Sequence, residues 1–81
     1  MEPSELRNRI LRQIETHEET GTSAYADDTA IAAALGGQLA DVQRQLLILE
    51  DEYKVELAKA SGPSYGARLT PRGMRALESS E

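Results

Sequence analysis

The sequence predicts a mainly helical α+β domain with a three-helix core, a small β-hairpin and a short C-terminal helix. Apolar residues repeat with the helical period in three stretches before residue 54, and the period then changes to strand-like alternation. Glycine-containing turns separate these stretches. The 81 residues are one domain's worth of chain, so we expect residues 1–81 to form a single unit with its last few residues disordered.

The first two helices are expected at residues 5–18 and 28–35. Apolar residues of the first helix share one face: Leu6, Ile10, Leu11 and Ile14. Glu18 and Glu19 are interpreted as its solvated end. Residues 22–26 predict a brief extended segment, after which Asp27 or Asp28 caps the alanine-rich second helix. The glycines at 36 and 37 end this helix.

The third helix, expected at residues 38–52, has the strongest periodic signal. Its apolar residues step by three and four positions, and they predict a buried stripe: Leu39, Val42, Leu46, Leu49 and Tyr53. Leu47 and Ile48 lie off this stripe. We expect them to be buried beneath the first helix and the hairpin, or to form a contact with a second copy of the chain.

A hairpin and a final helix follow. Val55 and Leu57 alternate with polar residues, residues 61–66 are turn-rich, and residues 67–69 can return as the second strand. Thr70 and Pro71 predict an N-cap and the first position of the last helix. The expected inward-facing residues of that helix are Met74 and Leu77.

This order of elements, from residue 27 to residue 77, resembles a winged helix-turn-helix domain over about two-thirds of the chain. The residues that carry the resemblance are Asp27, Ile31-Ala32, Leu35-Gly36, Val42, Arg44, Leu46, Leu49, Glu50-Asp51, Val55 and Leu69-Thr70-Pro71-Arg72-Gly73. The last five are similar to the wing-to-helix junction of MarR-type and related small regulators. Tyr53 stands where members of the family often carry a glycine.

The resemblance implies a sequence-specific DNA-binding transcription regulator, with helix 38–52 in the major groove and hairpin 54–70 as the wing. Glutamine can pair with adenine and arginine with guanine, while alanine permits close approach. The expected groove residues are Gln38, Ala40, Asp41, Gln43, Arg44 and Gln45. Four further residues are expected at phosphates or the minor groove: Lys59, Tyr65 near the wing tip, Arg68 and Arg72.

The charge distribution leaves two functions open. Residues 54–75 carry five basic side chains against Glu56 alone, which favours double-stranded DNA as the partner, bound by a homodimer on two half-sites. The net charge of −5 and the acidic run at 50–52 favour the alternative, a winged-helix module that binds protein and not DNA. Within that run, Glu50 is expected to be offset by Lys54.

Other classes of function lack the residues they need. The chain has no cysteine, and its single histidine, His17, supplies neither a metal cluster nor a catalytic relay. We therefore expect no enzyme activity, no cofactor and no metal site. No apolar run approaches the length of a membrane span and the N-terminus is acidic, so we expect a cytoplasmic protein without membrane contact.

Overall fold

The computed structural model describes residues 2–21, 25–59 and 63–79. Within them, four helices and three strands follow one another in the order α1 (Pro3–Glu19), β1 (Ala26–Asp27), α2 (Asp28–Leu35), α3 (Leu39–Asp51), β2 (Val55–Lys59), β3 (Tyr65–Leu69) and α4 (Pro71–Ser79). The expected α+β class is confirmed. The first three helices lie within two residues of their expected bounds.

The three strands form one antiparallel sheet in the order β1-β3-β2, so the expected hairpin is extended by a third strand. In the hairpin, Val55 pairs with Leu69 and Lys59 pairs with Tyr65. On the side of β3 that faces away from β2, Ala26 of β1 pairs with Ala67. The extended segment expected at 22–26 contributes only its last residue to β1, and residues 22–24 lie outside the described residues. Strand β3 begins at residue 65, so the last two residues of the turn expected at 61–66 belong to the strand, and residues 61 and 62 lie outside the described residues.

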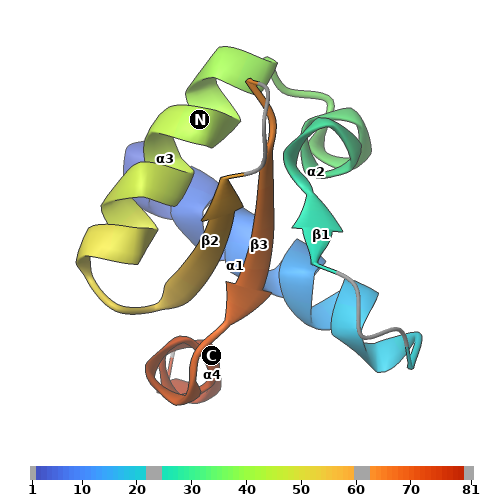
Figure 1. The fold of residues 1–81 in the computed structure, drawn as a ribbon. Helices are drawn as coiled ribbons and strands as arrows, with labels where there is room; N and C mark the ends of the chain where they lie inside the picture. Colours follow the sequence, from blue (N-terminus) through green and yellow to red (C-terminus); the bar gives the residue numbers. More distant parts are fainter. Residues whose placement is uncertain (1, 22–24, 60–62, 80–81) are drawn as a thin grey trace.

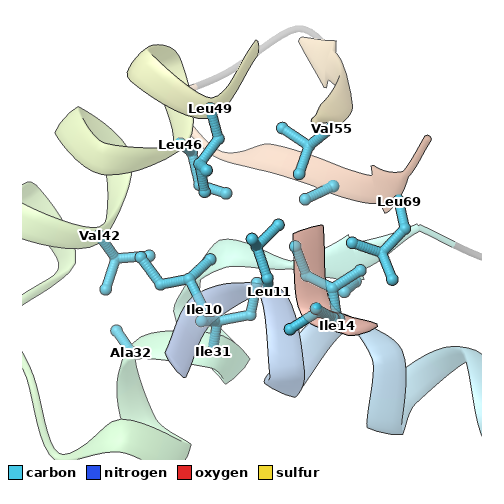
Figure 2. Packing of buried hydrophobic residues seen from close by; sticks show 13 residues of the cluster. Ile10, Leu11, Ile14, Ile31, Ala32, Val42, Leu46, Leu49, Val55 and Leu69 are labelled. Carbon is cyan, nitrogen blue, oxygen red and sulfur yellow. The ribbon is translucent and has the colours of Figure 1, made fainter. Parts of the chain in front are cut away.

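The core lies between the sheet and the first three helices. Helix α1 crosses behind the strands, α3 lies beside β2, and α4 lies beyond the end of β3 (Figure 1). Figure 2 shows side chains from α1, α2, α3 and the sheet converging on one cluster. Ile10, Ile14 and Leu46 have no exposed surface. Burying a side chain of this size contributes about 1.5–3 kcal/mol, so this cluster holds the elements together.

Both ends of the apolar stripe predicted for α3 differ from the expectation. Val42, Leu46 and Leu49 are fully buried, but Leu39 is 36% exposed and Tyr53 is 72% exposed. Leu39 is the first residue of α3. Tyr53 follows the last helical turn, where the chain has already changed direction. A stripe drawn on an ideal helix cannot show where the helix leaves the core.

The direction of the chain changes at Tyr53, which has a φ of 62°. The Lys54 amide donates to the Leu49 carbonyl at 2.9 Å and the Tyr53 amide donates to the Glu50 carbonyl at 3.0 Å. These two bonds form a Schellman motif, whose left-handed position favours glycine. The same motif ends α2 at Gly36, with a φ of 66°. Tyrosine therefore occupies a glycine position at the end of α3.

Helix α4 begins as expected but turns a different face inward. The Thr70 hydroxyl accepts a hydrogen bond from the Gly73 amide at 3.1 Å, which is an N-cap contact. Gly73 and Leu77 are buried, whereas Met74 is 46% exposed, so the prediction for Met74 is wrong. A Cβ at Gly73 would overlap the backbone carbonyl of Lys54. The missing side chain lets α4 lie against the chain that enters β2.

Candidate nucleic-acid interface

Helix α2 has a capped N-terminus. The Asp27 carboxylate accepts hydrogen bonds from the Thr29 amide at 3.4 Å and from the Thr29 hydroxyl at 2.6 Å. These bonds stabilise the charged carboxylate, and the Thr29 side chain is the main reason that the pKa of Asp27 lies below its ordinary value of 3.8. Of the two candidate caps, Asp27 is the one observed.

Asp28 has a different role, which the sequence analysis did not foresee. It is fully buried, and its Oδ2 accepts hydrogen bonds from Gln43 Nε2 at 2.7 Å and from the Tyr65 amide at 2.9 Å. One carboxylate thus connects α2, α3 and the start of β3. The sequence contained one sign of this role: two acids, Asp27 and Asp28, are adjacent at the start of α2, although capping a helix requires only one of them.

Gln43 completes this connection. Its Nε2 also donates to the Pro63 carbonyl, at 2.8 Å, so the side chain joins α3 to the loop between β2 and β3. Gln43 was expected to read bases, but the structure shows its amide bonded within the protein. Gln43 therefore connects α3 to α2 through Asp28, and to Pro63 just before β3.

The outer face of α3 carries four of the six residues expected in the groove. Ala40, Asp41 and Arg44 are exposed, as is Gln38, which precedes the helix and makes no side-chain cap. Arg44 Nη1 lies 3.5 Å from Asp41 Oδ1, and the two side chains are 68% and 53% exposed. Asp41 is therefore paired with the arginine about one turn further along the helix.

Gln45 is not on this face, and its expected exposure is wrong. Only 7% of the residue is exposed, and its Oε1 accepts a hydrogen bond from Arg7 Nη1 of α1 at 2.8 Å. At 100° per residue, Gln45 lies closer to the buried Val42 and Leu49 than to Arg44. It joins α3 to α1 instead of facing a ligand.

The two cations expected together in the wing point in opposite directions. Lys59 pairs with Tyr65 at the tip end of the hairpin, and its Nζ lies 3.3 Å from Glu50 Oε1 of α3. Side chains alternate along a strand, so Arg68 lies on the other face of the sheet. Its guanidinium lies 5.1 Å from the centre of the Tyr25 ring, within range of a cation–π interaction.

Arg72 lies far from the tip. It is exposed in the first turn of α4, which follows β3 at the end of the sheet opposite the hairpin loop (Figure 1). Across residues 2–21, 25–59 and 63–79, no acidic side chain lies within ion-pair distance of Arg72. The structure therefore separates Arg72 and Arg68 from the exposed face of α3.

Two acidic residues have partners other than those expected. Lys54 pairs with Glu52, at 3.3 Å, and Glu50 pairs with Lys59, so the expected pairing of Glu50 with Lys54 is wrong. Glu18 does not end in solvent, because its Oε2 accepts a hydrogen bond from the Leu69 amide at 2.9 Å. This bond connects α1 to the end of β3.

Leu47 and Ile48 are exposed in the middle of α3, at 40% and 37%. The expectation that they are buried beneath α1 and the hairpin is wrong, and their contact with a second copy stays a prediction. In the described part of the chain, no group of His, Asp and Glu side chains could hold a metal ion. None of the helices described there has the length and apolarity needed to cross a bilayer.

Comparisons of this chain with known protein families, with curated proteins and with solved structures found no match.

Proposed function

We propose that the chain is a winged helix-turn-helix transcription regulator that binds DNA, with α3 in the major groove and the hairpin as its wing. The arrangement of the four helices and three strands is compatible with this fold. The observation that carries the proposal is the connection through Asp28 and Gln43, which holds Pro63 and Tyr65, at the start of the returning strand, beside α3. A helix that enters a groove needs such fixed geometry to keep register with base edges.

Arg44 is the proposed base-reading residue. It lies at the centre of the outer face of α3, and its fork of donors can pair with the acceptor edge of guanine. Ala40 lies one turn before it and leaves room for close approach. In the unbound chain, Asp41 lies within ion-pair distance of the guanidinium. The exposed Gln38 and the uncapped amides of the first turn of α3 can donate to a phosphate.

Few phosphate contacts are available to a chain of net charge −5. Lys59 and Arg44 are each within ion-pair distance of an acid, so binding would exchange those partners for phosphate or base. With two such contacts, log affinity should fall with log salt at a slope of about −2. The predicted complex is therefore weak on mixed sequence, and its affinity should fall only about tenfold between about 50 and 200 mM salt.

A fluorescence anisotropy titration with duplex DNA tests the proposal. We expect binding to mixed-sequence DNA at about 50 mM salt and tighter binding to a site selected from random sequence. On the selected site, Arg44→Ala should cost about 1–3 kcal/mol. Arg75→Ala is the matched control, because it removes the same charge from an exposed position on α4.

Two results would reject this function. The first is no binding to any duplex at about 50 mM salt, where phosphate contacts are strongest. The second is equal affinity of the Arg44→Ala and Arg75→Ala proteins for the selected site, which would show that α3 does not read bases.

The exposure of Leu47 and Ile48 favours a second candidate, a winged-helix module that binds protein. Two adjacent apolar side chains in the middle of an exposed helix face suit a protein partner better than phosphate. For such a module, neutralising Arg44 and Lys59 should leave the binding of the partner intact. The same substitutions should abolish binding to DNA if the first candidate is correct.

A further inference from the structure

We infer that the outer face of α3 binds the same face of a second copy of this chain, with the two α3 helices antiparallel. The centre of the contact is the pair Leu47 and Ile48, which are 40% and 37% exposed. On a helix these two residues flank Arg44 and Asp51, which lie along the middle of the exposed face. The apolar pair is thus bracketed by one cation and one acid.

The positions of these charges select the register. Arg44 lies three residues before Leu47, and Asp51 lies three residues after Ile48. An antiparallel pair centred between Leu47 and Ile48 therefore places Arg44 of one copy opposite Asp51 of the other. Two-fold symmetry repeats the contact, so the interface contains it twice. A parallel pair would instead place Arg44 against Arg44, and like charges repel.

The helix ends favour the same direction. Asp51 belongs to the acidic run at the C-terminus of α3, where the helix dipole opposes negative charge. The N-terminus of α3 has no side-chain cap. In this antiparallel register the acids at 50–52 of each copy lie opposite residues 43–45 of the other, about one helical turn from its uncapped amides, whereas a parallel pair would place them at the same end as the acids of the second copy.

This dimer differs from one bound to two half-sites of DNA, because it covers Arg44. The same face of α3 cannot contact a second copy and a major groove at once. The inference does not rest on the proposed function, since self-association is measured without nucleic acid.

Sedimentation velocity of the full chain over a range of concentrations tests the pairing. As the protein concentration increases, we expect the apparent molecular mass to rise from that of a monomer towards that of a dimer. Arg44→Glu and Asp51→Arg should each weaken association about tenfold, because each converts two attractive contacts into repulsive ones. The double variant restores opposite charges and should associate like the native chain. Arg75→Glu is the control for the change in net charge and should have no effect.

Two outcomes of sedimentation would overturn the inference. One is a native chain that stays monomeric up to about 1 mM, the weak end of measurable affinity. The other is a double variant that associates no better than the single variants. Circular dichroism of each variant identifies any loss of folding, which is not expected for exposed positions.

Disulfide formation tests the register separately, because the native chain contains no cysteine. Ile48→Cys would place two thiols beside the two-fold axis, and oxidation should link them. Ala40→Cys is on the same exposed face, but antiparallel pairing separates its two copies by about 22 Å along the helices, so no link should form. Equal cross-linking of both variants would refute the antiparallel register.

The double variant also separates this inference from the proposed function. Arg44→Glu with Asp51→Arg should keep self-association while losing affinity for DNA. If the native chain binds DNA but does not self-associate, the inference fails and the proposed function stands. If it self-associates but binds no DNA, the reverse holds.

Discussion

Replacing Tyr53 with glycine should stabilise the protein, although it removes a large side chain. The φ of 62° at Tyr53 costs a residue with a Cβ about 1–2 kcal/mol. Glycine avoids this cost but loses about 0.5–1 kcal/mol through its greater freedom in the unfolded chain. The ring is 72% exposed, so little buried apolar area is lost. The net gain of Tyr53→Gly over Tyr53→Ala should be about 0.5–1 kcal/mol.

Thermal unfolding followed by circular dichroism measures this difference. For a domain of this size, a gain of 0.5–1 kcal/mol raises the midpoint by about 2–8 °C. Tyr53→Ala is the matched control for the loss of the ring, since it keeps the Cβ that makes the left-handed conformation costly. Ala40→Gly, at an exposed position in the first turn of α3, should have the opposite sign and destabilise by up to about 1 kcal/mol. A Tyr53→Ala protein as stable as Tyr53→Gly would refute the reasoning.

Three further predictions concern the contacts that position α4, the hairpin and α2. In Gly73→Ala the new Cβ would overlap the backbone carbonyl of Lys54, just before β2. We therefore expect urea unfolding to show a decrease of about 1–3 kcal/mol in the free energy of unfolding. An unchanged unfolding midpoint would contradict the close contact. Asp28→Ala removes the acceptor of the Tyr65 amide and one of the two acceptors of Gln43 Nε2, so it should cost about 1–3 kcal/mol and speed hydrogen exchange at the start of β3. The NMR titration midpoint of Asp27 should lie below 3.8 and rise in Thr29→Ala. Because the pKa of Asp27 is lower in the folded chain, its ionised carboxylate stabilises the protein above about pH 3.8. This contribution is lost as the pH falls through the pKa of the folded chain.

The helices and the hairpin were predictable because their signals are local. The second helix was predicted with its observed bounds, 28–35, since its cap, its alanine-rich interior and its terminal glycine lie within a few residues of one another. The change of period after residue 54 likewise predicted strands, which pair in the observed hairpin. Such features depend on residues that lie close together in the sequence.

The composition of the candidate site was less predictable, because the face a residue presents depends on what packs beside it. Gln45 and Arg44 are adjacent polar residues on one helix, yet the first bonds to Arg7 of α1 and the second is exposed. Asp28 and Gln43 are separated by 15 positions and meet only because α2 packs against α3. No period within a single helix contains that information.

The amino-acid pattern alone determined which segments are helix or strand and where most of them stop, since caps, glycines and apolar periods act over one or two turns. The packing of distant segments decided the rest: that Asp28 is buried among three elements, that Lys59 and Arg68 face opposite sides of the sheet, and that Leu47 and Ile48 are exposed. The physical reason is that burial belongs to a pair of surfaces, and a sequence read along one segment shows only one of them.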